Sequence, residues 1–169
     1  MIDKPQPDEY VPFHNTYISK VPDGDVLALL EDLKESTYKL FSNMSGDKAN
    51  YAYAEGKWTL KEILGHLIDQ ERIFGYRLLC FSRESIELPG YDQEVYVNKS
   101  TYNSRTIQSL ASELRVARES NLYLFRSLTD EQLNRKGVAS GNTISVRAIL
   151  YIIAGHELHH LGIVKERYF

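Results

Sequence analysis

The chain has 169 residues, the size of one ordinary domain, and 43% of them are hydrophobic, which is enough for one buried core. The 20 Lys and Arg residues against 23 Asp and Glu give a net charge of −3, which excludes a broad electrostatic attraction to nucleic acid or to anionic membranes. Cys80 is the single cysteine, the opening Met1–Pro5 lacks the layout of a secretory signal, and the longest apolar run, Ala148–Ala154, is too short to span a membrane. We therefore predict a single cytoplasmic domain over residues 1–169, with no nucleic-acid or membrane partner.

The N-terminal segment carries Pro5, Pro7 and Pro12 among charged residues and has no helical or strand pattern. It is predicted to be an extended arm that lies on the body of the protein. From Asp23, predicted as an N-cap, apolar residues recur at steps of three and four, which predicts the first helix: Val26, Leu30, Leu33, Leu40 and Met44.

The second helix is predicted from a capping box. Thr59 and Glu62 have the spacing in which each side chain satisfies a free backbone donor of the other residue, and the helix should run to about Arg83. The following segment, Glu84–Arg105, is too long for a tight turn and too aromatic for a flexible linker. It is predicted to be an irregular loop that folds over one end of the body.

Two further helices follow in the second half of the chain. Apolar residues at steps of three and four from Ile107 to Leu128 predict the third helix, and Thr129 is predicted to cap a further short turn. The fourth helix is predicted to begin near Ser145. With no convincing two-residue alternation, the chain is predicted to be all-α: a four-helix bundle with an extended N-terminal arm and a long loop between helices two and three.

The last helix carries the strongest chemical signal. His156 and His160 are four residues apart, so both imidazoles lie on one side of the helix, at positions where packing alone would favour Leu or Ile. Two neighbouring buried imidazoles are costly unless they have partners, and one shared metal ion would satisfy both. The alternative is two core histidines, each hydrogen-bonded to a carbonyl. His159 points away from this face, and His14 is predicted to lie on the surface.

A third ligand is available from the second helix. His66 lies at the edge of its apolar stripe, beside a strip of polar residues, and the residues alone leave open whether it is a ligand or surface. Three imidazoles would leave open positions on Zn, Ni, Fe or Mn for water or substrate, which is typical of catalytic sites. Glu62 is either an orienting group or base for this site, or only the second half of the capping box. We favour the capping role.

The stretch His156–His160 also matches the His-Glu-x-x-His pattern of zinc proteases, in which the glutamate activates water. That interpretation needs a further ligand downstream, but residue 163 is Ile and residue 166 is Glu. Glu157 also turns away from the histidine face. A zinc protease is therefore the weakest of the functional hypotheses.

A cysteine and an aromatic cluster lie outside the set of candidate ligands. Cys80 lies fourteen residues beyond His66, about 20 Å along the predicted helix, and is expected to be a buried, inert thiol. The aromatic cluster in the long loop is able to cover a substrate pocket, although surface packing is the commoner role of such residues. Its members are Tyr91, Asp92, Tyr96 and Tyr102.

Four stretches resemble the DinB-like superfamily in residue types and in order. The most specific elements are the tryptophan eight residues before the helix-two histidine and the paired histidines near the C-terminus. The stretches are Trp58–Leu67, Glu71–Arg77, Leu88–Gln93 and Gly155–His160.

The resemblance implies a four-helix bundle, often a homodimer, in which His66, His156 and His160 surround a divalent metal ion. Related proteins include metal-dependent transferases and isomerases that use low-molecular-weight thiols, and others are described as metal-dependent hydrolases. Many members have no known reaction. A Gly-Gln pair common in the family after the last ligand is replaced here by Leu161-Gly162-Ile163, which puts any orienting role of that glutamine in doubt.

The leading hypothesis is a metal-dependent enzyme, either a thiol S-transferase or a hydrolase, acting on a small electrophilic substrate. A low-molecular-weight thiol would be the co-substrate of the transferase. The alternative is a non-catalytic metal-binding or stress-related bundle in which the ion stabilises the core. No catalytic residue beyond the three ligands is assigned from the sequence.

Overall fold

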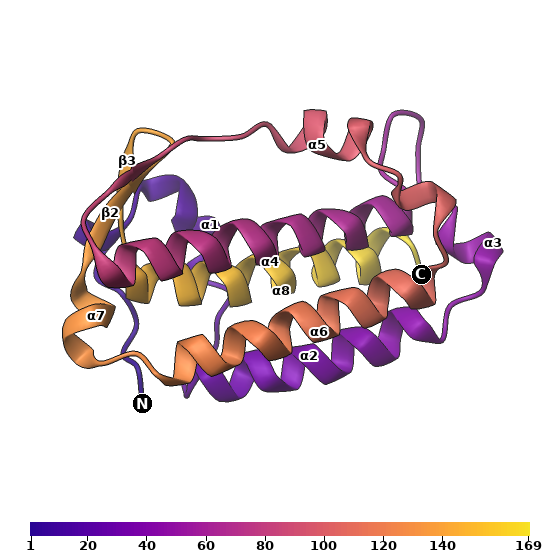
Figure 1. Ribbon diagram of the computed structural model, residues 1–169. Helices are drawn as coiled ribbons and strands as arrows, with labels where there is room; N and C mark the ends of the chain where they lie inside the picture. The colour runs from indigo at the N-terminus through magenta and orange to yellow at the C-terminus, as the bar shows by residue number, and fades with distance from the viewer.

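The computed structural model describes residues 1–169, and four long helices lie side by side along its length (Figure 1). Helix α4 contacts α6 on one side and α8 on the other, and α2 closes the ring by packing against the same two helices. This arrangement confirms the predicted all-α four-helix bundle. The four helices are α2 (Val26–Ser42), α4 (Leu60–Arg83), α6 (Ile107–Arg126) and α8 (Val146–Arg167).

Each long helix begins at a residue whose side chain caps the backbone. Thr59 and Glu62 form the predicted capping box at the start of α4, and Ser145 accepts a hydrogen bond from the Ala148 backbone at the start of α8. The predicted cap of the first helix is wrong by two residues. Asp25 accepts from the Leu27 backbone, whereas Asp23 pairs with Lys4.

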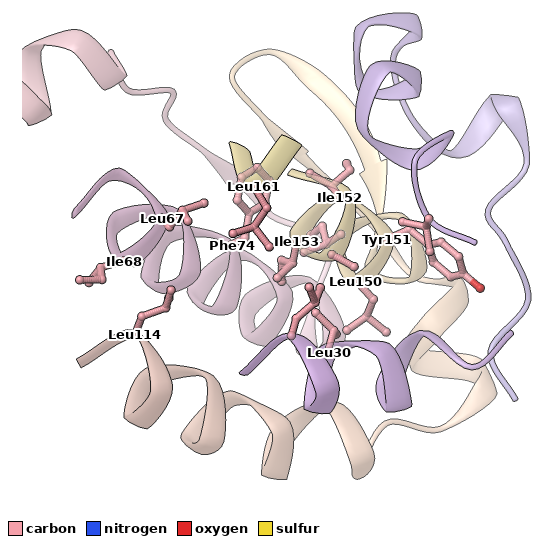
Figure 2. Packing of buried hydrophobic residues seen from close by; sticks show 14 of the residues in the cluster. Leu30, Leu67, Ile68, Phe74, Leu114, Leu150, Tyr151, Ile152, Ile153 and Leu161 are labelled. Carbon is pink, nitrogen blue, oxygen red and sulfur yellow. The ribbon is translucent and has the colours of Figure 1, made fainter. Parts of the chain in front are cut away.

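The core fills the space between the four helices. Figure 2 shows buried side chains from all four meeting there, among them Leu30 of α2, Phe74 of α4 and Leu114 of α6. Burial of one such side chain is worth about 1.5–3 kcal/mol, so this packing is the main force that holds α4 and α8 together. Residues from Ala148 to His156 on α8 are buried on every side, because α1 covers the face of the helix that the bundle leaves free.

A small sheet at one end of the bundle corrects the prediction that the chain has no strands. Strand β1 (Glu87–Leu88) is parallel to β2 (Lys136–Ala139), which is antiparallel to β3 (Asn142–Ser145). Two to four residues are too few to show a two-residue alternation in the sequence. The hairpin turns at Ser140 and Gly141, both with positive φ, at 54° and 74°.

The N-terminal arm lies on α8, as predicted, but it is not simply extended. It contains the turns η1 (Pro7–Glu9) and η2 (Pro12–His14) and the short helix α1 (Asn15–Ile18), which packs against α8. The approach is close, because a Cβ atom added to Gly155 would lie 2.1 Å from the Tyr17 carbonyl oxygen. Gly155 therefore allows the arm to reach the helix that carries the paired histidines.

The segment between α4 and α6 is also more ordered than predicted. After β1 it crosses above α4 along the length of the bundle, rather than over one end, and then forms α5 (Gln93–Lys99) and η3 (Tyr102–Ser104) (Figure 1). The Tyr102 ring fits against Gly65, where an added Cβ would lie 2.1 Å from the ring. The short helices α3 (Gly46–Ala49) and α7 (Asp130–Asn134) complete the connections, and Thr129 caps α7 as predicted.

None of the helices combines the length and the apolar character that crossing a membrane would require.

Candidate metal centre

Three histidines from two helices converge between the N-terminal half of α4 and the C-terminal half of α8. His156 Nε2 lies 3.1 Å from His66 Nε2 and 3.1 Å from His160 Nε2. One ligand atom from each ring lies within 4.8 Å of the others. The structure thus brings together the three histidines that the sequence analysis selected as candidate ligands.

Burial keeps these imidazoles neutral. His66 is 1% exposed and His156 is 5% exposed, and burial lowers the pKa of His66 to about 4 and that of His160 to about 3. The pKa of His156 is lowered well below its usual value, first by burial and then by the neighbouring histidines. A neutral imidazole is the form that binds a metal ion, so no proton has to be displaced at pH 7.

The nitrogen spacing fits a divalent ion. Zinc binds histidine nitrogen at about 2.0–2.1 Å, and tetrahedral angles then place two such nitrogens about 3.3 Å apart. The two observed separations of 3.1 Å are close to that value. Without an ion, a single central nitrogen, His156 Nε2, would have to serve both neighbours, so one imidazole would lack a good partner.

Aromatic residues hold the rings in place. The Trp58 ring lies 4.9 Å from the His66 ring and is stacked 6.4 Å from the His160 ring, measured between centroids. Its indole N–H donates to Glu94 of α5 at 3.2 Å. On the other side, Tyr17 of the arm places its ring edge-on to His156 at 5.1 Å. Elements distant in the sequence therefore restrict the movement of the ligands.

The site is open on the side of His160. This histidine is half-buried and lines a pocket of about 210 Å³, whereas His66 and His156 are closed off from solvent. The pocket lies between the start of α4, the start of α5 and the end of α8. Its other lining residues are Tyr53, Gly56, Lys57, Trp58, Ile63, Gln93, Glu94, Ile163 and Tyr168.

Glu157 belongs to a different cluster. Its Oε1 accepts from the Thr37 hydroxyl at 2.5 Å and its Oε2 from Arg118 at 2.8 Å, and it is not among the residues that converge with the histidines. Arg118 also donates to both carboxylate oxygens of Glu71. Because both oxygens of Glu157 are engaged, it is not free to act as the base that a zinc protease requires.

The other candidate residues do not join the three histidines. Glu62 accepts from the Thr59 backbone and from Asn103, so the favoured capping role is the one observed. His159 is half-buried against Tyr17 and lies outside the cluster. Cys80 is half-buried rather than buried as predicted.

His14 is not a surface residue as predicted. It is half-buried, and burial is the main cause that lowers its pKa. His14 lines a pocket together with residues of α4 and the β2–β3 hairpin, and no local sequence pattern links these segments to the arm.

The aromatic cluster of the long loop divides into separate contacts. Tyr91 packs on Tyr96 at 5.0 Å and accepts a hydrogen bond from Gln70. Tyr102 donates to Asp69 at 2.6 Å, and Asp92 caps α5. The start of α5 lines the pocket at His160, but the residues that reach it are Gln93 and Glu94 rather than Tyr91, Tyr96 or Tyr102.

Comparisons with known proteins agree with this geometry. A family model of the DinB superfamily matches residues 29–164. A protein of Oceanobacillus iheyensis named "putative metal-dependent hydrolase" is 26% identical over 136 residues, covering 79% of this chain and 78% of that protein.

Two solved structures from Bacillus subtilis have a similar fold. YfiT, described as "a probable metal-dependent hydrolase with an unusual four-helix bundle topology", has a TM-score of 0.77 at 18% identity, covering 90% of this chain and 95% of its own. The DinB-like protein YjoA has a TM-score of 0.61 at 22% identity, covering 84% and 87%. The family match over most of the chain, together with the shared fold, shows that this protein is a member of the DinB superfamily.

Proposed function

We propose that the protein is a metal-dependent enzyme in which His66, His156 and His160 hold one divalent ion and a small electrophilic substrate enters through the pocket beside His160. The observation that carries this proposal is the asymmetry of the centre: two ligands are sealed, and the third faces a pocket of about 210 Å³. A purely structural ion would be enclosed on all sides. The name of the Oceanobacillus relative supports hydrolysis, and transfer of a small thiol is the second reaction that the same centre would support.

An ion with an exchangeable position lowers the pKa of the water or thiol that it binds, to near 7 for water on zinc. The chain supplies three neutral imidazoles that keep the net positive charge of the ion. Trp58 and Tyr17 restrict the movement of the ligand rings, so the three nitrogens would hold an ion in one place. Ile63, Ile163 and the ring of Trp58 give the pocket an apolar wall against which an organic substrate can pack.

The first test is activity with two reaction types. Metal-loaded protein should hydrolyse an activated ester or accelerate attack of a small thiol on a chloro-dinitro-arene, with a rate that rises through one ionisation near neutrality. His66→Ala should reduce the rate to the uncatalysed level, whereas His159→Ala should retain it. A cobalt-substituted sample separates the reactions, because thiol binding at the ion adds a sulfur charge-transfer band.

The second test asks whether the pocket is the route to the ion. Ile163→Trp should fill the pocket, lower the turnover and leave the metal content unchanged. Lys165→Trp, two residues further along α8 and exposed, is the matched control and should keep full activity. If Ile163→Trp is as active as the wild type, or if no water or thiol exchanges at the ion, the protein is a structural metal-binding bundle.

A further inference from the structure

A second pocket, of about 580 Å³, lies away from the three clustered histidines, between the N-terminal arm, α4 and the β2–β3 hairpin. It shares no lining residue with the pocket at His160. Arg77 of α4 lines it and is eleven residues beyond His66, about 16 Å along the helix axis. Much of the wall is apolar, from Val11, Phe13, Phe74, Ile144 and Ile149.

The polar part of this wall contains a buried cation with no counter-ion. Arg77 is 7% exposed, and its Nη2 donates to the Pro89 carbonyl at 3.1 Å and reaches the Ser140 hydroxyl at 3.5 Å. No carboxylate lies within ion-pair distance. Its Nε and Nη1 groups have no acceptor in the protein and are not sealed from solvent, so they are available to a ligand.

Arg118 is a second buried arginine, and its charge is neutralised within the chain. It is 3% exposed and is neutralised by Glu71 and Glu157 at 2.8 Å. Burial of an uncompensated charge is strongly unfavourable, and Arg77 lacks the carboxylates that neutralise Arg118. Besides its two oxygen acceptors, Arg77 has as neighbours the Phe74 ring at 5.3 Å and the Tyr91 ring at 5.8 Å.

Two further polar groups beside Arg77 have unused hydrogen-bonding capacity. His14 lines the same pocket, and its Nδ1 is buried without a partner, which is unfavourable. The Ser140 hydroxyl accepts from Arg77, which leaves its own hydrogen free to donate. Ser140 stands at a φ of 54°, where glycine would be less strained.

We propose that this pocket binds a small organic monocarboxylate, with the carboxylate on Arg77 and the apolar body against the side chains of the arm and the core helices. A carboxylate matches the planar donor fork of arginine. A phosphate monoester carries nearly two negative charges, and the pocket offers one cation, so the monocarboxylate is the better match. The site is independent of the metal centre and of the reaction proposed there.

The test uses benzoate as the probe on zinc-loaded, full-length protein. Amide chemical shifts should move saturably at His14, Arg77 and Ser140 and stay unchanged around His160. Benzyl alcohol, with the same ring and no charge, should bind at least tenfold more weakly by calorimetry, and phenyl phosphate should bind more weakly than benzoate. Shifts confined to His160 and Trp58, equal binding of benzyl alcohol, or tighter binding of phenyl phosphate would each overturn the proposal.

Two variants complete the test. Arg77→Met keeps most of the side-chain volume and should weaken benzoate binding at least tenfold, whereas Arg115→Met, on the exposed face of α6, should leave it unchanged. Ser140→Gly suits the positive φ, removes only the hydroxyl and should weaken binding by a smaller factor. If Arg77→Met does not fold, the chemical shifts of the wild type and the affinity of Ser140→Gly still test the proposed site. Unchanged benzoate binding in Ser140→Gly, together with an unchanged chemical shift at Arg77 in the wild type, would contradict the site.

Discussion

Two buried polar clusters include nearby residues of α4 and α8, and they differ in the partners of their polar atoms. In the first, Arg118 of α6 meets Glu71 and Glu157, and every charged atom has a partner within the chain. In the second, His66, His156 and His160 turn their Nε2 atoms toward one another, and no charged partner joins them. One cluster is therefore an ion-pair network within the chain, and the other is a set of neutral groups of the kind that binds metal ions.

The clusters also differ in charge. Burial opposes the charge on Arg118, but the two glutamates outweigh this effect and raise its pKa. At the histidines burial acts without opposition, so their pKa values fall and the rings stay neutral. A buried group keeps its charge only where partners are built around it, and neutral rings that face one another are arranged to receive a cation.

The largest expected effect is on the Arg118 cluster. Arg118→Met leaves two buried carboxylates uncompensated and should lower the free energy of unfolding by about 3–5 kcal/mol. Arg115→Met on the same helix removes an exposed pair with Glu35 and should change it by about 0–1 kcal/mol. Urea unfolding of the two variants measures the difference, and equal effects would show that the buried cluster does not stabilise the fold.

Acid should act on the histidine cluster in the metal-free protein. The folded pKa of His66, about 4, lies below the ordinary value of 6.5, so its stabilising contribution is complete above pH 6.5 and is lost as the pH falls toward 4. His66 alone should account for about 3 kcal/mol. Urea unfolding of chelated protein between pH 7 and pH 4 tests this, with His66→Leu as the variant that should lack most of the dependence. If the free energy of unfolding of His66→Leu depends on pH as steeply as that of the wild type, groups other than His66 cause the dependence.

Metal removal should produce a loss of similar size at neutral pH. An ion that binds only the folded state, present at a hundred times its Kd, adds about 2.7 kcal/mol. A chelator should therefore lower the melting temperature of the wild type and leave that of His160→Ala unaltered. If the chelator does not change the melting temperature of the wild type, the three histidines are core residues rather than metal ligands.

The smallest effect concerns the arm that covers His156. Gly155→Ala would bring a Cβ atom within 2.1 Å of the Tyr17 carbonyl, which should displace the arm and destabilise the protein by about 1–3 kcal/mol. Gly162→Ala on the same helix meets nothing within 4 Å and should stabilise by up to about 1 kcal/mol. Thermal unfolding distinguishes them, and a stabilising Gly155→Ala would show that the arm does not need this close contact.

The parts of the structure that depend on local periodicity could be predicted from the sequence. The capping box of Thr59 and Glu62 fixed the start of α4, and the four-residue spacing of His156 and His160 put both on one face of α8. His66 could be selected only through the family resemblance. Its partners are 90 and 94 residues away in the sequence, and a local pattern cannot predict a contact over that separation.

The remaining features depend on contacts between distant segments. In the sequence, Arg118 resembles any arginine on an amphipathic helix. Its ion pairs with Glu71 and Glu157 come from two other helices, so they cannot be predicted from its own segment. Arg77 belongs to the strip of polar residues beside His66 on α4, and it is buried because the Pro89 loop and the hairpin pack against it. The strands are too short to detect, since their pairing and not their composition defines them.

Metal content tests most directly whether His66, His156 and His160 hold one metal ion. Untagged protein, purified without added metal, should contain close to one divalent ion per chain by elemental analysis. His160→Ala should lose it, and His159→Ala, altered at the adjacent histidine outside the cluster, should retain it. Full metal loading of His160→Ala, or equal loss in both variants, would contradict the assignment.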